Sequence, residues 1–245
     1  MPELNTARPT MRVKPKLFTS HLVNHELLAS KFNYYEFETT EPFDFDAGQY
    51  VNAIVAEQTF RAYSIASKIS ENRFSLLVDT RPGGKGSQFF EALKVGDEMK
   101  FLGPLGLFII RDDGAENILL LGTGSGMSPV RCIVEDELLV KGTKIPIYVY
   151  MGLTLTSEIF WKDYFESFEQ KFPNFHFRLA ILQPEEGWQG HKGFNTQMMQ
   201  MDFPDTRKCS AYLCGHPAMI KGATEILLSS GSPKEHIYEE KFFAQ

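Results

Sequence analysis

The pattern of apolar and polar positions changes near residue 112 and divides the chain into two regions. From Lys16 to about Arg111, short alternating segments are separated by turns, which predicts strands at 32–39, 50–56, 60–66, 73–78 and 98–102. Period-two runs of β-branched and aromatic residues at this spacing are typical of an antiparallel barrel or sandwich. One helix interrupts them, because Ser87 suits an N-cap and apolar residues recur at helical spacing over 88–93.

After the polar break at 112–114, continuous apolar runs alternate with amphipathic segments. The runs predict strands at 117–121, 145–151, 175–182, 210–213 and near Ile237, and the amphipathic segments predict helices at 128–140, 157–171, near Thr196 and at 218–228. This alternation indicates βαβ units around a parallel sheet that is buried on both faces. We therefore predict a polar arm over 1–15, an antiparallel β-barrel domain over 16–112 and an α/β parallel-sheet domain over 115–245.

Composition and charge narrow the class of protein. The 245 residues are 43% hydrophobic, which suffices for two cores. Lys and Arg number 25 against 31 Asp and Glu, giving a net charge of -6, and no concentrated basic patch occurs, which disfavours a nucleic-acid binder. The N-terminus does not resemble a secretory signal, and no run of about 18 apolar residues occurs. We expect a soluble cytoplasmic protein without a transmembrane segment.

Cysteine usage indicates reduced thiols. Cys132, Cys209 and Cys214 are odd in number and show no paired spacing, which argues against a disulfide framework. A cysteine-ligated iron–sulfur cluster needs about four cysteines. We expect no metal site in this sequence and assign any such cluster to a partner.

Two glycine turns in the second region follow predicted strands. Gly122, Gly124 and Gly126 stand between an apolar run and an amphipathic segment, and Gly215 stands between Cys214 and a second predicted helix. Free N–H groups at a helix start bind anions such as a dinucleotide pyrophosphate. The first turn departs from the G-x-G-x-x-G spacing, so a purely structural role remains open. Because ligands bind beyond the carboxyl ends of parallel strands, one ligand contacting both turns is expected.

Three segments of the first region exceed what a barrel needs. In Arg61-Ala62-Tyr63-Ser64, alternation places Arg61 and Tyr63 on one face and Ala62 and Ser64 on the other. An arginine and an aromatic ring can clamp a phosphate and stack on a flat ring, although an ordinary exposed edge strand is the alternative. The glycine-rich loop at 82–87 enters a helix and is either an anion site or a plain connection. The segment 103–106 indicates a rigid turn.

Six short motifs occur in an order that resembles the ferredoxin–NADP reductase superfamily, and in particular its bacterial FAD-dependent NAD(P)H oxidoreductases that serve oxygenases. The resemblance covers nearly the whole chain beyond the arm. The motifs are Arg-x-Tyr-Ser at 61–64, Gly-Lys-Gly-Ser at 84–87, Gly-Pro-Leu-Gly at 103–106, Gly-Thr-Gly-x-Gly-x-x-Pro at 122–129, Cys-Gly-x-Pro at 214–217 and Glu-Lys-Phe at 240–242.

The resemblance implies FAD and NAD(P)H as cofactors. It places Arg61 on the flavin phosphates, Tyr63 on the isoalloxazine ring and Ser64 near the reactive ring nitrogen. Simple alternation sends Ser64 the other way, so a twist, a bulge or a ring straddling the strand end has to reconcile the two. The implied cofactor-binding residues are Arg61, Tyr63, Ser64, Val78, Gly84, Gly86, Ser87, Gln88, Gly122, Thr123, Gly124, Gly126, Pro129, Cys214, Gly215 and Pro217.

The resemblance also implies a set of catalytic residues. Cys214 would flank the nicotinamide ring, and Glu240 would lie beside the isoalloxazine. Phe242 would shield the flavin, although Phe243 is an alternative because the chain continues past both. The implied catalytic residues are Tyr63, Ser64, Cys214, Glu240 and Phe242.

The implied reaction is hydride transfer from NAD(P)H to flavin, followed by release of single electrons to a separate acceptor protein such as a ferredoxin, a flavodoxin or an oxygenase component. The alternative is a non-catalytic flavin- or nucleotide-binding regulatory subunit of a larger redox complex. Such acceptors are commonly acidic, and the candidate docking cations are Lys14, Lys16, Lys31 and Arg73.

The sequence predicts a preference for NADH over NADPH. Family members that select NADP commonly carry arginines after the second and third strands of this domain, where they hold the 2′-phosphate. The matching stretches 152–154 and 181–186 contain no arginine, and the second contains Glu185 and Glu186. Carboxylates without a compensating cation repel a phosphate.

Overall fold

The alternating apolar positions of the first half close into a six-stranded barrel. In the computed structural model, which describes residues 13–81 and 83–241, the strand order is β1-β2-β5-β4-β3-β6 and every neighbouring pair is antiparallel. The strands are β1 (Lys16–Ala29), β2 (Phe32–Thr39), β3 (Tyr50–Ala56), β4 (Thr59–Ser70), β5 (Arg73–Asp79) and β6 (Glu98–Leu105). Inward-facing aromatic rings fill the barrel, as the stacked rings of Phe37 and Phe74 illustrate.

Helix α1 (Lys85–Ala92) packs against the barrel, where the Tyr35 hydroxyl donates to the carbonyl of the fully buried Phe90 at 2.9 Å. The helix begins earlier than the sequence predicted. Its N-cap is Gly84, so the assignment of Ser87 as N-cap was wrong and Ser87 lies buried in the first turn. The predicted turn at 103–106 was also displaced, because residues 103–105 belong to β6 and the backbone turns at Gly106 with φ of 93°.

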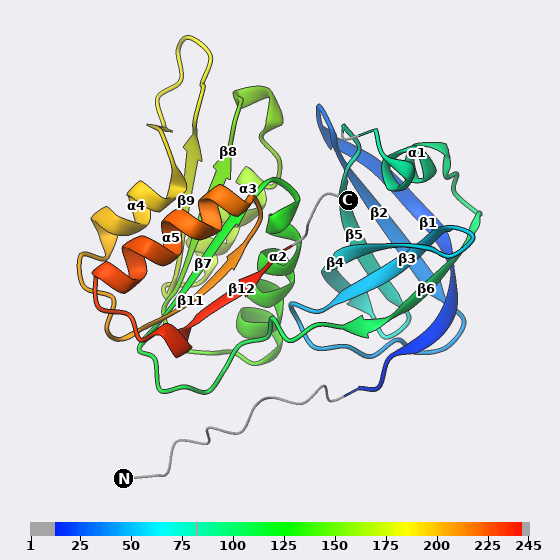
Figure 1. Cartoon of the computed structure of the whole chain (residues 1–245), viewed down its shortest axis with the longest axis horizontal. Helices are drawn as coiled ribbons and strands as arrows, with labels where there is room; N and C mark the ends of the chain where they lie inside the picture. Colours follow the sequence, from blue (N-terminus) through cyan, green and yellow to red (C-terminus); the bar gives the residue numbers. More distant parts are fainter. Residues whose placement is uncertain (1–12, 82, 242–245) are drawn as a thin grey trace.

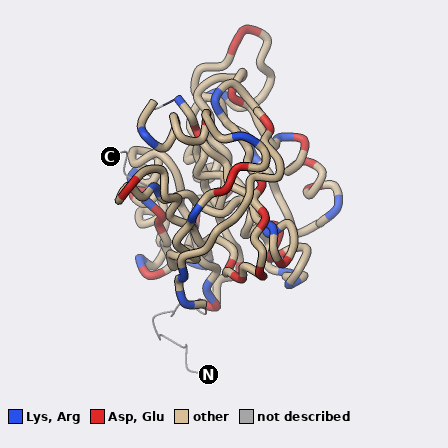
Figure 2. Tube along the Cα trace, turned by 90° about the vertical axis from the view of Figure 1, so that its right-hand side faces the viewer, with Lys and Arg blue, Asp and Glu red and all other residues tan. Residues whose placement is uncertain are grey.

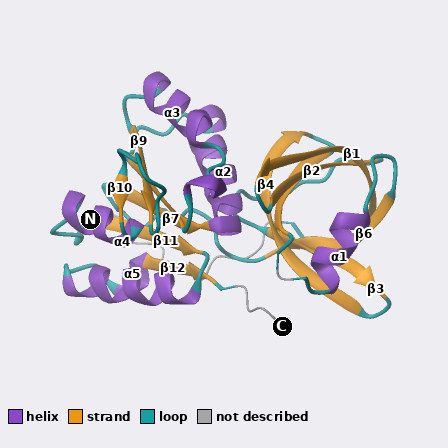
Figure 3. Ribbon diagram, turned by 90° about the horizontal axis from the view of Figure 1, so that it is seen from above, coloured by secondary structure: helices purple, strands orange, loops and turns teal. Residues whose placement is uncertain are grey.

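The second half forms a six-stranded parallel sheet of order β10-β9-β8-β7-β11-β12. Its strands are β7 (Asn117–Thr123), β8 (Ile147–Leu153), β9 (Phe175–Ile181), β10 (His191–Lys192), β11 (Cys209–Cys214) and β12 (Ile237–Glu240). Its helices are α2 (Met127–Glu135), α3 (Lys162–Lys171), α4 (Asn195–Asp202) and α5 (Pro217–Ser229). Seen from above, α2 and α3 cover one face and α4 and α5 the other (Figure 3). The predicted fold class is confirmed.

Two predicted helices are interrupted. The first ends as α2 and continues as a π-helical turn, η2 (Asp136–Val140). The second is broken by the 3₁₀ turn η3 (Thr156–Glu158) and by Trp161, whose φ is 52°. A non-glycine residue in the left-handed region ends helical geometry, so α3 starts only at Lys162. As a result Glu158 lies in a connection that reaches toward the barrel.

The barrel and the parallel-sheet domain stand side by side, with α2 between them (Figure 1). Phe32 of the barrel packs on Phe160 with ring centroids 4.6 Å apart. Arg131 of α2 lies over the barrel's Tyr34 at 5.3 Å, and the Ser67 hydroxyl donates to Glu135 at 2.5 Å. Aromatic packing and polar contacts together therefore hold the two domains against each other.

Candidate functional site

Three neighbouring strands bring their carboxyl ends to the side of the sheet that faces the barrel. Cys214 at the end of β11 is in register with Gly122 of β7 on one side and with Glu240 of β12 on the other. The next residues along β7 lead into the turn η1 (Gly124–Gly126), where Gly124 approaches the ring of Phe32. The edge at which parallel sheets bind ligands is thus the edge next to the barrel.

The two glycine turns of this edge interlock. A Cβ on Gly126 would overlap the Cys214 carbonyl, and a Cβ on Gly215, whose φ is 136°, would overlap the Thr123 side chain. The His216 N–H donates to the Thr123 hydroxyl at 2.8 Å. The structure therefore brings together the two turns that the sequence predicted to touch one ligand, and it gives Gly126 and Gly215 a packing reason as well.

Side chains around the turns fix their shape. The Asn195 amide donates to the carbonyls of Gly122 and Tyr150, at 3.3 and 3.0 Å. Pro129 is buried in the first turn of α2, and Pro217 begins α5. No side chain caps the N-terminus of α2, although the Met127 N–H already donates to the Gly124 carbonyl, so an anion here would rely on the other N–H groups of the turn.

On the barrel side, Arg61 and Tyr63 meet the glycine-rich loop. A Cβ on Gly86 would lie 2.5 Å from the Tyr63 hydroxyl and 3.3 Å from Cγ of Arg61. The N-terminus of α1 has no side-chain cap, and the Gln88 amide donates to the Gly83 carbonyl at 3.0 Å. The Arg61 stem and the Tyr63 hydroxyl thus lie beside the uncapped N-terminus of α1, a combination that suits a phosphate, while the Arg61 guanidinium donates to the Phe60 carbonyl at 2.8 Å. Val78 is buried in the barrel core and can offer a ligand only its backbone.

Ser64 lies on the opposite face of β4 from Tyr63, as alternation requires. It pairs with Tyr50 of β3, and the Tyr50 ring packs over Gly106. Ser64 is 6% exposed, and its Oγ has no hydrogen-bond partner among the described residues. Buried hydroxyls are normally satisfied, so this one is suited to a bound ligand. The orphaned hydroxyl and the glycine cradle at residue 86 both fit a flavin nucleotide.

Glu240 is a buried carboxyl group at the boundary between the two domains. Burial raises the pKa of Glu240 to about 7. A Cβ on Gly106 would lie 3.5 Å from the Glu240 carboxylate, which is how close β12 comes to the barrel. Burial, and secondarily the Glu240 charge, raise the pKa values of Tyr50 and Cys214, so Cys214 is a neutral thiol. Near neutral pH, Glu240 can both accept and donate a proton. Phe242 and Phe243 lie outside the described residues.

The structure corrects one set of candidates and adds others. Lys31 was a candidate docking cation, but it is 7% exposed and paired with Asp79 and Glu158, so that assignment was wrong. Arg73 pairs with Glu38. Figure 2 shows blue and red segments interspersed over the face that is turned to the viewer. The sequence analysis missed Tyr50, Asn195, Lys31 and Glu158 as site residues, since only long-range pairing brings them to this edge.

Metal ligands do not gather anywhere in 13–81 or 83–241, where no group of three or more His, Cys, Asp or Glu side chains could hold an ion. Over the same residues, none of the helices has the length and apolar character needed to cross a bilayer.

Comparison with known proteins identifies both halves. Residues 19–110 match the family described as "Oxidoreductase FAD-binding domain", and residues 120–225 match "Oxidoreductase NAD-binding domain". The toluate 1,2-dioxygenase electron transfer component of Pseudomonas putida is 32% identical over 80% of this chain and 58% of its own length. The reductase component DmpP of phenol 2-monooxygenase from Pseudomonas sp. (strain CF600) is 34% identical over 82% of this chain and 59% of its own. The chain therefore spans less than two thirds of these relatives.

Solved structures share the fold. The Amycolatopsis cytochrome P450 reductase GcoB superposes with a TM-score of 0.87 at 26% identity, over 97% of this chain and 72% of its own. The cytochrome b5 reductase domain of Ulva prolifera nitrate reductase gives a TM-score of 0.80 at 20% identity, over 92% of this chain and 97% of its own. The second likeness concerns the fold alone.

Proposed function

Because the chain belongs to the ferredoxin–NADP reductase superfamily, with an FAD-binding domain followed by an NAD-binding domain, we propose that it oxidises NAD(P)H and delivers single electrons to an acceptor protein. One observation carries the proposal. A chain of contacts joins the barrel to the sheet edge. In the barrel, Ser64, whose hydroxyl has no partner among the described residues, pairs with Tyr50, and the Tyr50 ring packs over Gly106. Gly106 in turn approaches the carboxylate of Glu240, which is in register with Cys214. A site shared between the two cofactor domains is what transfer between their cofactors requires.

FAD, when bound, supplies the chemistry that accepts a hydride and releases electrons one at a time. The chain supplies position. We assign Arg61 and the N-terminus of α1 to the phosphates, Tyr63 to a ring face and Ser64 to a polar ring atom. Burial raises the pKa of Tyr63 to about 12, so it remains a neutral phenol at physiological pH.

On the nucleotide side, we assign the backbone of Gly122, Thr123, Gly124 and Gly126 to the pyrophosphate and Cys214 with Gly215 to the nicotinamide ring. The Cys214 thiol is fully buried and neutral, so it places no charge at this point. Glu240, the titratable group beside it, holds or moves a proton near neutral pH.

We propose a protein acceptor of the kind that these relatives serve, since the two oxygenase relatives are named as an electron transfer component and a reductase component. A ferredoxin, a flavodoxin or an oxygenase component fits this role. We place the protein in the cytoplasm, where reduced nicotinamide is available and where its three free, buried cysteines stay reduced.

A pair of arginine variants tests the proposal. Arg61 contacts the glycine loop, whereas Arg73 makes a part-exposed pair with Glu38 on the same barrel. Arg61→Ala should lower flavin retention after gel filtration at least fivefold and lower NADH-dependent ferricyanide reduction in proportion. Arg73→Ala should retain as much flavin and activity as the wild-type protein. Equal flavin retention in both variants would contradict the assignment.

A further inference from the structure

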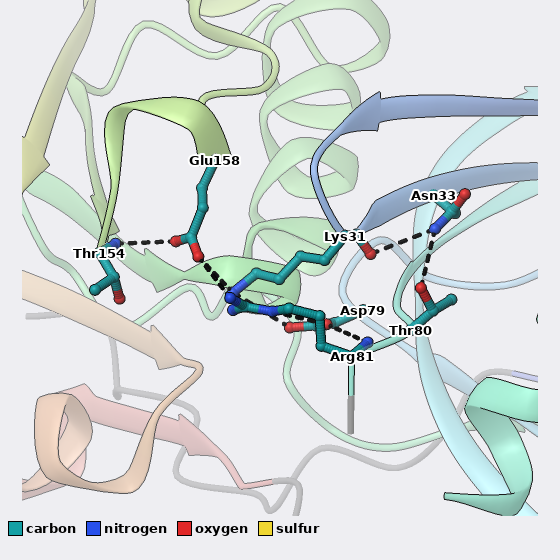
Figure 4. Close-up of polar contacts among 7 residues, drawn as sticks. All are labelled: Lys31, Asn33, Asp79, Thr80, Arg81, Thr154 and Glu158. Carbon is teal, nitrogen blue, oxygen red and sulfur yellow. Dashed lines mark hydrogen bonds and ion pairs between the residues drawn. The ribbon is translucent and has the colours of Figure 1, made fainter. Parts of the chain in front are cut away.

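A nearly buried ion pair connects the barrel to the parallel-sheet domain beside the nucleotide edge. Lys31, in the turn between β1 and β2, lies 3.0 Å from Glu158 of η3. Their side chains are only 7% and 2% exposed. Figure 4 shows the two side chains reaching toward each other from separate domains. Charged side chains are seldom buried to this extent unless they are paired. The Lys31–Glu158 pair is therefore a specific contact of the interface between the two domains, which we call the seam.

The two oxygens of the Glu158 carboxylate have different partners. Oε2 accepts from the backbone N–H of Thr154 at 3.1 Å, and Oε1 faces both Lys31 and Arg81, each at 3.0 Å (Figure 4). Arg81 belongs to the connection that leads into the glycine-rich loop before α1. One carboxylate therefore touches the barrel, the approach to the proposed flavin-phosphate loop and the end of β8.

Thr154 lies at the carboxyl end of β8, the end of a parallel strand at which ligands bind in such sheets. It follows directly on β8, two residues after Gly152, which is in register with Thr123. Thr154 is exposed, so the turn that it begins faces solvent at the carboxyl edge of the sheet. The hydrogen bond from its N–H is a contact that fixes this turn from outside its own strand.

The charges around Glu158 are balanced. Lys31 also lies 3.5 Å from the Asp79 carboxylate. The Arg81 guanidinium lies 3.9 Å from Asp79, and the Arg81 backbone N–H donates to the Asp79 carboxylate at 3.0 Å. Two cations and two carboxylates thus form one group. Replacing a buried ion pair by apolar residues is often neutral for stability, whereas removing one partner is costly. Stability alone therefore does not account for a pair in this place.

We propose that Glu158 is a positioning residue: by accepting a hydrogen bond from the Thr154 N–H it fixes the turn after β8 and so sets where the nucleotide's ribose lies, while Lys31 and Arg81 contact its other oxygen from the barrel side. This inference rests on the proposed function. Glu158 touches neither cofactor in the proposal. It acts through the Thr154 N–H, and it requires an oxygen acceptor at that point rather than a negative charge.

Two uncharged variants of similar length separate these requirements. Glu158→Gln keeps an oxygen for the Thr154 N–H, whereas Glu158→Met does not, and both remove the charge. In the FAD-loaded protein we expect the Thr154 amide to exchange with deuterium at least tenfold faster in Glu158→Met than in Glu158→Gln. We expect the KM for NADH to rise at least fivefold in Glu158→Met, with kcat within twofold and flavin content unchanged.

A double variant guards against misfolding of Glu158→Met. Lys31→Met combined with Glu158→Met removes one charge of each sign and leaves Asp79 with Arg81, so the fold is expected to tolerate it. It should show the same fast exchange at Thr154 and the same raised KM. Equal exchange and equal KM in the Gln and Met variants would overturn the inference. The exchange measurement needs no nucleotide, so it stands even if NADH fails to reduce the protein, which would instead refute the proposed function.

Discussion

Gly86 and Tyr63 approach each other so closely that a Cβ on residue 86 would lie 2.5 Å from the Tyr63 hydroxyl oxygen. Gly86→Ala must therefore displace Tyr63, whose ring is held against Phe90 at 4.8 Å. We expect the dissociation constant for FAD to rise at least tenfold, measured by fluorescence titration of flavin-free protein. Gly222→Ala is the matched control, because a Cβ at 222 meets nothing within 4 Å. Unchanged FAD binding in Gly86→Ala would place the flavin elsewhere.

Glu240 makes stability depend on pH. Burial raises the pKa of Glu240 from 4.5 to about 7, so between these values the folded chain holds a proton that the unfolded chain has released. The free energy of unfolding therefore falls as pH rises through this window, since stability decreases wherever the folded state binds more protons. Glu240→Gln mimics the protonated form and removes this dependence.

The measurement is the Tm of flavin-free protein from about pH 4.5 to about pH 8. Glu240→Gln should match the unchanged protein at the acidic end and exceed its Tm at the alkaline end. Glu116→Gln, which alters an exposed carboxylate paired with Lys208, should show no such divergence. A constant Tm difference between Glu240→Gln and the unchanged protein at all pH values would contradict the assignment.

Arg131 stabilises the seam between the domains. Its guanidinium lies over Tyr34 of the barrel and over Trp161 and Tyr164 at 4.6 Å each, and it pairs with Glu135 at 2.9 Å. Because its side chain is only 14% exposed, Arg131→Met should lower the free energy of unfolding by about 3 kcal/mol in urea.

Arg207 provides the comparison for that measurement. It pairs with Asp205 at 2.5 Å, but its side chain is 74% exposed. Arg207→Met should leave the free energy of unfolding nearly unchanged, because exposed ion pairs contribute little to stability. Equal losses in the two variants would mean that the Arg131 contacts contribute no more than a surface pair.

The preference for NADH is expected to persist in the folded protein. Arg81 is the described arginine that reaches Glu158 beside Thr154, and its guanidinium is engaged by Glu158 and faces Asp79. A 2′-phosphate would have to compete with two carboxylates for it. We predict a kcat/KM for NADH at least tenfold above that for NADPH, measured in the same assay. A tenfold advantage for NADPH would refute this.

Local patterns predicted the elements of both domains, because period-two and period-3.6 burial are properties of contiguous sequence. Strands β2 and β3 begin and end where alternation placed them. Strand β1 was not predicted, since most of its residues are partly exposed and alternation there is weak. The break before α3 was also missed, because it depends on the left-handed conformation of Trp161, for which the residue type gives no signal.

The candidate site was predicted as far as its glycine turns allowed. Gly122 and Gly215 mark strand ends that chain order alone identifies, and their convergence follows from parallel pairing. Tyr50 and Glu158 were missed, because their roles arise from contacts between distant segments. The same distance effect explains why Lys31 was taken for a surface cation although its charge is buried against a carboxylate of the other domain.

Anaerobic titration of the purified, FAD-loaded protein with NADH tests the central claim most directly. We predict a yellow protein whose flavin absorbance at about 450 nm is bleached by NADH. The colour should return when a one-electron acceptor is added. A properly folded protein that takes up no added FAD would contradict the account. So would one whose bound flavin neither NADH nor NADPH bleaches.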